Sequence, residues 1–206
     1  CHYLTGPQKS KWINISITNV LILPAIFVAL ILGGVTIYKK HLSPITVPIY
    51  AVIQGIFLGA ISYTFNSLYD GIVITAISYT LSILFVMLTL YRTGIIKPTE
   101  NFKLGVAAGT GGIALIYLAN FVMSFFGTGL SIMDINNASM YSIGFSLLVI
   151  VMASLNLVVD FDFIEEGSEK RAPKYMEWYG AFGLLVTLIW LYLEILRLLA
   201  KMNSRK

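Results

Sequence analysis

The chain has 206 residues, of which 57% are hydrophobic and 12% are charged, and its mean hydropathy is +0.82. Soluble domains carry about 25% charged residues, so the composition excludes a soluble globular domain and predicts one integral membrane domain spanning residues 1–206. The net charge of +4 is small, and the Lys and Arg residues lie between apolar stretches, so we expect no nucleic-acid partner. The single cysteine excludes an intrachain disulfide framework and any cysteine-based metal cluster.

Six apolar stretches are long enough to cross a lipid bilayer, for which about 20 residues suffice. They cover residues 18–38, 45–68, 72–91, 104–126, 138–159 and 176–199. Helices satisfy their own backbone groups in lipid, and there is no sustained alternation of the kind that a β-barrel needs. We therefore predict an all-α, polytopic helical membrane bundle with six transmembrane helices. Residues 1–17 form a loop, residues 18–200 the bundle with the sixth helix at its centre, and residues 201–206 a tail.

The connecting segments differ sharply in positive charge. The connections after the first, third and fifth stretches carry two, three and three Lys or Arg residues, which sums to eight, and those after the second and fourth carry none. Positive connections face the cytoplasm, which predicts the orientation of the helices. Alternation then places both ends of the chain outside, although both ends are basic. A further helix upstream would place the true N-terminus inside.

Two carboxylates stand out because of where they lie. Glu194 interrupts the last apolar stretch, and Asp160 directly follows the fifth. An ionisable group inside a span costs about 2.5–3.5 kcal/mol on insertion scales, so it usually has a purpose. We expect these two acids to meet, with the other helices as walls around them. Amides such as Gln54, Asn120 and Asn156 could line a polar path, although hydrogen bonding between helices is the simpler interpretation.

Other interpretations of these residues stay open. Glu194 could pair with Arg197 or Arg92, and Asp160 could be an ordinary acid at a helix end. An intramembrane aspartyl hydrolase would also need two carboxylates. Both histidines lie outside the predicted spans and no His-Glu-x-x-His motif occurs, which argues against a zinc protease. We expect no enzymatic activity.

Three segments resemble the bacterial branch of the Bax-inhibitor (transmembrane Bax-inhibitor-motif) family. They read APKYMEWYGAFGLLVTLIWLYLEILRLL, YRTGIIKPTENFK and NLVVDFDFIEEG, and the resemblance runs from the first span to the C-terminus. It implies a seven-helix fold whose first helix is absent from this chain, and a place in the bacterial inner membrane. It also implies a calcium leak controlled by pH. The alternative that it implies is a membrane interaction protein that regulates a membrane protease or a cell-death partner, without transport.

The resemblance also implies a site. Bacterial members are described with an aspartate pair on the last two helices, and by motif this pair falls on Asp160, in SLNLVVD, and on Glu194, in LYLE. Asp162 is a competitor for the first role, but on a helix it points about 200° away from Asp160. If the last two spans form a hairpin centred near residue 169, Asp160 lies level with about Gly180. Its pairing with Glu194 then requires residues 174–182 to lie partly along the membrane interface.

The expected mechanism is a proton-sharing pair. Two carboxylates in one low-dielectric site cannot both ionise cheaply, so at low pH a shared proton fastens the last two helices together. As the pH rises the proton leaves, the carboxylates repel each other and a leak path opens. Protons and Ca²⁺ are the expected partners besides lipid, with no cofactor. Any Ca²⁺ site at Asp160 and Glu194 would be weak, because tight sites use six to eight oxygen ligands.

Overall fold

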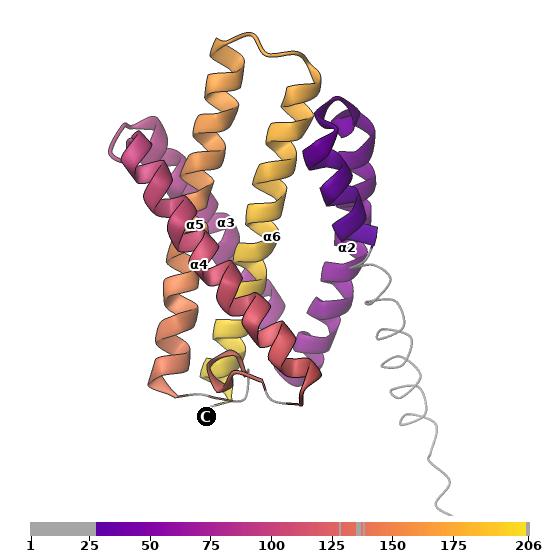
Figure 1. The fold of residues 1–206 in the computed structure, drawn as a ribbon. Coiled ribbons are helices and arrows are strands. Elements are labelled where there is room, and N and C mark those ends of the chain that lie inside the picture. Colours follow the sequence, from indigo (N-terminus) through magenta and orange to yellow (C-terminus); the bar gives the residue numbers. More distant parts are fainter. Residues whose placement is uncertain (1–27, 128, 135–136, 138, 205–206) are drawn as a thin grey trace, which may run out of the picture. The chain divides into compact units, whose positions relative to one another are not determined.

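The computed structural model describes residues 28–127, 129–134, 137 and 139–204, and this part of the chain is helices joined by short connections (Figure 1). The all-α prediction is therefore confirmed. The elements in chain order are the helix Val28–Tyr38, η1 (Lys40–Leu42), α2 (Ser43–Leu68), α3 (Ile72–Arg92), α4 (Glu100–Phe125), η2 (Ser131–Met133), α5 (Met140–Glu169) and α6 (Tyr175–Asn203).

Five of the described helices, α2 to α6, are long and apolar enough to cross a membrane. Their outward-facing side chains are large and apolar, with Ile74, Phe85 and Leu115 each more than 60% exposed. Such surfaces suit lipid rather than water, and the chain is a multi-pass integral membrane protein. The predicted first span, 18–38, is helical over its described part, Val28–Tyr38. Residues 18–27 with Pro24, the predicted loop 1–17 and residues 205–206 lie outside the described residues.

The chain divides into two compact units. Unit 1 holds the described residues up to Thr64 together with Lys174–Tyr179, and unit 2 holds the described residues of 65–173 and 180–204. In unit 1 the hydroxyl groups of Thr36 and Thr46 share a buried hydrogen bond of 2.7 Å. The Ser43 hydroxyl donates to the Tyr175 carbonyl at 2.7 Å. These contacts fasten the start of α2 to its neighbours within the unit.

In unit 2 the central element is α5, which packs against α3 and α4. One face of α5 is fully or almost fully buried at positions that recur every three or four residues, namely Ser142, Ser146, Val149, Ala153 and Leu157. This spacing is that of one helix face. Figure 1 shows α4 crossing α5 obliquely. In α5 and in α6, 39% of the residues in the apolar stretch are buried, against 11–22% in the other candidate spans. The predicted central position of the last helix is thus shared with α5.

Three helix ends differ from the prediction by more than two residues. The fifth helix does not stop at Val159 but continues to Glu169, so most of the predicted connection 161–174 is helical. This segment contains no proline before Pro173, and the Lys170–Glu166 ion pair links two of its turns. Hydropathy marks where lipid ends, and a helix can continue into water. In the same way α4 begins at Glu100, with the Thr99 hydroxyl as its N-cap acceptor.

The third difference concerns the C-terminal end. Residues 201–206 are predicted as a tail, but α6 continues through Asn203 and the Lys201 side chain is fully buried. The ammonium group reaches acceptors inside unit 2, and these contacts hold the last turn of the helix in place. By contrast, the short gap between the predicted spans 45–68 and 72–91 is a tight turn in the structure, where Gly71 adopts a positive φ of 75°.

Candidate functional site

Glu194 is buried in unit 2 and fully engaged. Its side chain accepts a hydrogen bond of 2.6 Å from the Tyr117 hydroxyl of α4. The Arg197 Nη1 atom, one helical turn further along α6, donates to both carboxylate oxygens at 2.9 and 3.2 Å. The same Nη1 lies 3.0 Å from the Tyr117 oxygen, and the guanidinium carbon lies 5.4 Å from the centre of the Tyr117 ring. We call these three residues the Glu194 cluster.

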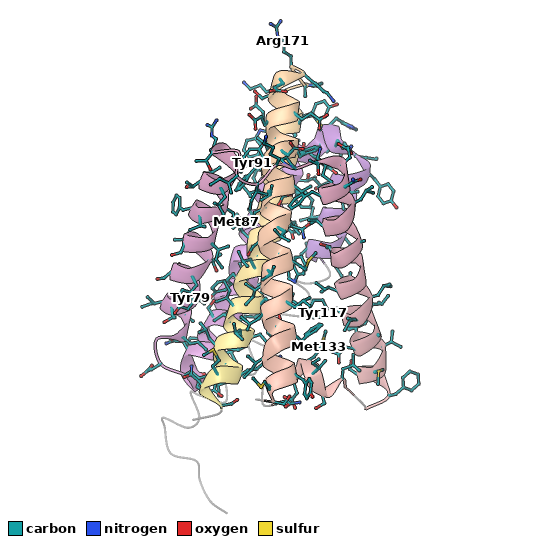
Figure 2. All side chains as sticks on the ribbon, turned by 90° about the vertical axis from the view of Figure 1, so that its left-hand side faces the viewer. Tyr79, Met87, Tyr91, Tyr117, Met133 and Arg171 are labelled. Atoms are coloured by element: carbon teal, nitrogen blue, oxygen red, sulfur yellow. The ribbon has the colours of Figure 1, made fainter. Side chains whose placement is uncertain are left out.

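The cluster joins two helices through a compensated charge. Glu194 is 1% exposed, and a buried carboxylate is tolerated when a cation and further hydrogen bonds satisfy it. Arg197 supplies the cation and Tyr117 supplies a neutral donor from α4. The interpretation that Glu194 pairs with Arg197 is therefore confirmed. Figure 2 shows Tyr117 closer to Met133 than to Tyr91, which places the cluster toward the η2 end of unit 2.

Asp160 lies in a different setting, on the face of α5 that meets α6. Its Oδ1 atom is 3.3 Å from the position that a Cβ atom on Gly183 would occupy. The Thr187 hydroxyl hydrogen-bonds the carboxylate. The other oxygen, Oδ2, is buried and has no hydrogen-bond partner in the part of the chain that the structure describes. One carboxylate oxygen in the α5–α6 contact is thus left unsatisfied.

The structure does not bring Asp160 and Glu194 together. Gly183 and Thr187 precede Glu194 by 11 and 7 residues on one continuous helix, which corresponds to about 16 and 10 Å along its axis. The prediction that the two acids meet is therefore wrong, and the geometry of a helical hairpin explains why. The connection between α5 and α6 is short, so residues equally far from it face each other, and Glu194 is much farther from it than Asp160.

This separation also bears on the expected metal site and on hydrolysis. Among the described residues there is no group of three or more His, Cys, Asp or Glu side chains that could hold a metal ion. Asp160 and Glu194 therefore do not form one weak Ca²⁺ site in this structure. An aspartyl hydrolase would need both carboxylates at one water molecule, and the separation does not provide this arrangement.

The secondary candidates lie apart from one another. Asp162 forms an ion pair of 2.6 Å with Lys103 of α4, on a different side of α5 from Asp160, as the helical angle between them predicts. Arg92 is exposed at the end of α3. In unit 1 the Gln54 amide donates to the Tyr50 hydroxyl at 2.8 Å, while its oxygen is buried without a partner among the described residues.

The other amides mainly tie elements together. Asn156 of α5 donates to the Thr110 hydroxyl of α4 at 2.7 Å, and the Asn120 oxygen accepts from the Leu130 backbone at 2.8 Å. Only the Asn156 bond joins two helices, as the simpler interpretation expects. The Asn120 bond joins α4 to the connection before η2, and the Gln54 bond stays within α2.

Lys201 is a buried charged residue that sequence reasoning missed. Its ammonium nitrogen lies 3.0 Å from the Ile132 carbonyl, 3.2 Å from the Ser142 carbonyl and 3.0 Å from the Ser146 hydroxyl. An ammonium group has three donors, so all three are used. The group joins η2, the first turns of α5 and the end of α6. A signal was available in Ser142 and Ser146, two polar residues four apart in an apolar stretch.

Comparison with known sequences agrees with the local motifs. The family described as Bax inhibitor 1 like matches residues 4–204. The chain belongs to the Bax inhibitor 1 like family. The resemblance inferred from the three sequence segments is therefore confirmed. No curated protein and no solved structure matches this member of the Bax inhibitor 1 like family.

Proposed function

We propose that this Bax inhibitor 1 like protein is a pH-sensitive cation leak protein whose gate lies at Asp160, in the contact between α5 and α6. One observation carries the proposal: the Asp160 Oδ2 atom is buried and has no protein partner among the described residues. Intramembrane ionisable groups usually mark ion or proton pathways. Either a proton or a cation at Oδ2 would satisfy this oxygen. A gate that responds to pH and passes cations requires a group that can accept both.

The contact around Asp160 suits a gate because it is small and adjustable. Gly183 brings the α6 backbone close to the carboxylate, and Thr187 offers one hydroxyl. When Asp160 is protonated, the neutral acid can stay in this contact. When it is ionised, the charge requires water or a cation, so α5 and α6 separate locally and the leak increases as pH rises.

Glu194 then has a different role from the expected one. In the proposed mechanism it does not share a proton with Asp160. Together with Tyr117 and Arg197 it holds α4 against α6 while the contact at Asp160 changes. Ca²⁺ is the favoured ion, bound only transiently, because the site offers far fewer than the six to eight oxygens of a tight site.

We further propose that the protein resides in a bacterial inner membrane, with the connection between α3 and α4 and the one after α5 in the cytoplasm. The distribution of Lys and Arg supports this orientation. The proposal includes no enzymatic activity.

The decisive experiment measures Ca²⁺ flux as a function of pH in liposomes that contain the purified protein. We expect Asp160→Asn to flatten the flux-versus-pH curve, since the amide cannot titrate. Asp162→Asn is the matched control: this acid lies two residues away on the same helix but pairs with Lys103, and it should leave the pH response in place.

Three results would count against the proposal. If Asp160→Asn keeps the wild-type curve, the sensor lies elsewhere. If Na⁺ and Ca²⁺ leak equally, the preference for calcium is wrong. If the wild-type protein shows no flux at any pH, the interaction role, regulation of a membrane protease or a cell-death partner, becomes the better hypothesis.

A further inference from the structure

A cavity of about 330 Å³ opens between the last turn of α3 and the last turns of α5, away from Asp160 and the Glu194 cluster. Leu88, Phe161 and Ile164 form its apolar part, and Arg92, Glu165 and Ser168 its polar part. All of these residues belong to unit 2. The cavity is therefore amphipathic, with one cation, one carboxylate and one hydroxyl group beside an apolar surface.

The negative group in this cavity is held in position. The Tyr91 hydroxyl donates a hydrogen bond to the Glu165 carboxylate. The Tyr91 ring in turn packs against Phe161, with ring centres 5.9 Å apart and planes tilted by 47°. Phe161 is only 8% exposed, so this support is anchored in the core. Figure 2 shows Tyr91 between Arg171 and Met87, toward the end of unit 2 where α5 ends.

The positive group, by contrast, is free to bind a ligand. Arg92 is exposed, and within the described residues no hydrogen bond or ion pair joins its guanidinium to another side chain. Guanidinium groups bind phosphate through two parallel hydrogen bonds. Arg92 is also the first charged residue after the apolar run of α3, which places it at the boundary between lipid and water.

The apolar part of the cavity is open toward lipid. Leu88 is 37% and Ile164 is 40% exposed, and both lie less than two turns from Arg92 or Glu165 along their helices. A ligand here would place a polar group at the level of Arg92 and Glu165 and hydrocarbon against Leu88 and Ile164. A membrane phospholipid has this division.

We propose that this cavity binds a phospholipid whose headgroup carries both a phosphate and a primary ammonium, as in phosphatidylethanolamine. Arg92 binds the phosphate, and Glu165, oriented by Tyr91, accepts hydrogen bonds from the ammonium. A purely anionic headgroup has no positive charge to place beside Glu165. A choline headgroup has no N–H donor for the carboxylate. The assignment does not depend on ion leak, since no residue of the proposed gate lines the cavity.

The test uses the purified full chain in detergent, titrated with phosphatidylethanolamine, phosphatidylglycerol or phosphatidylcholine, with bound lipid counted by native mass spectrometry. We expect phosphatidylethanolamine to bind most tightly. Arg92→Gln should weaken it about tenfold, the order expected for one charge-assisted contact, and Arg92→Lys less. Glu165→Gln should abolish the preference over phosphatidylglycerol. Arg171→Gln is the control, because Arg171 is exposed in the connection after α5 and does not line the cavity (Figure 2).

Three results would overturn the assignment. Equal affinity for the three lipids would mean that the headgroup is not recognised. Equal loss in Arg92→Gln and Arg171→Gln would mean that general surface charge attracts lipid. If glycerophosphoethanolamine, which lacks acyl chains, bound as tightly as the intact lipid, the ligand would be a free phosphate compound and not a membrane lipid.

Discussion

Asp160 and Glu194 are acids on neighbouring helices of the same unit, yet their surroundings differ in nearly every respect. Glu194 has a guanidinium, a phenol and full burial, and its partners come from α4 and α6. Asp160 has a hydroxyl, a glycine and one oxygen without a partner among the described residues. The first carboxylate is satisfied on every side that the structure describes, and the second is not.

This difference separates a stabilising ion-pair cluster at Glu194 from a contact at Asp160 that can respond to pH or cations. A buried ion pair with all hydrogen bonds made is costly to disturb from either side. A carboxylate with an unsatisfied oxygen gains from any proton, water or cation that reaches it. Two acids that look equivalent in sequence can therefore have different roles. Removing Glu194 should mainly lower stability, whereas removing Asp160 should mainly change the pH response.

The largest expected effect is the loss of the Glu194 cluster. Glu194→Leu leaves Arg197 without its counter-charge and the Tyr117 hydroxyl without its acceptor, so we expect a loss of about 3–5 kcal/mol in unfolding free energy. Unfolding by SDS in mixed micelles measures it. Glu166→Gln breaks an exposed ion pair with Lys170, and because water screens such a pair, this variant should lose far less stability. Similar losses of unfolding free energy in the two variants would show that the Glu194 cluster does not stabilise the contact between α4 and α6.

A smaller loss is expected at Lys201. Lys201→Met leaves the Ile132 and Ser142 carbonyls and the Ser146 hydroxyl without their shared donor, and relief of a buried charge partly offsets this. We expect destabilisation of about 2–3 kcal/mol in the same unfolding assay. Lys97→Met, at an exposed lysine between α3 and α4, should change little. If Lys201→Met were as stable as Lys97→Met, the three hydrogen bonds would contribute nothing.

The smallest effect tests the Asp160 side of the comparison. In Gly183→Ala the new Cβ atom would lie 3.3 Å from Asp160 Oδ1, so the gain of about 1 kcal/mol from replacing a helical glycine should be cancelled. Gly144→Ala meets no atom within 4 Å and should keep that gain. We also expect Gly183→Ala, but not Gly144→Ala, to shift the flux-versus-pH curve. Equal behaviour of both variants would mean that the contact at Asp160 tolerates added volume.

Much of the fold follows from apolar stretches alone. The third span was predicted to within a residue of α3, because Gly71 and Arg92 mark its ends clearly. The end of α5 was missed because Phe161–Glu169 is polar enough to leave the membrane and still favourable enough for a helix. Apolar patterns report the solvent around a segment, and the backbone hydrogen bonds continue regardless.

The site was only partly predictable. The two buried or half-buried acids were found because charge inside an apolar run is rare. Their partners could not be found, since Tyr117 is one of twelve tyrosines and lies 77 residues before Glu194. Contacts of this range depend on how far each residue lies from its helix connection. The short connection between α5 and α6 decides that Asp160 meets Gly183 rather than Glu194.

The position of Lys201 in the chain has a consequence for biosynthesis. A protein is synthesised and inserted from its N-terminus, so η2 and the start of α5 enter the membrane before the last turns of α6 exist. Until then the Ile132 and Ser142 carbonyls lack their ammonium donor, and Tyr117 lacks Glu194. Unit 2 therefore cannot complete its internal bonding until α6 has been translated. Assembly of its η2 end waits for the final helix, and a nascent chain released before Glu194 would be left open to quality-control proteases.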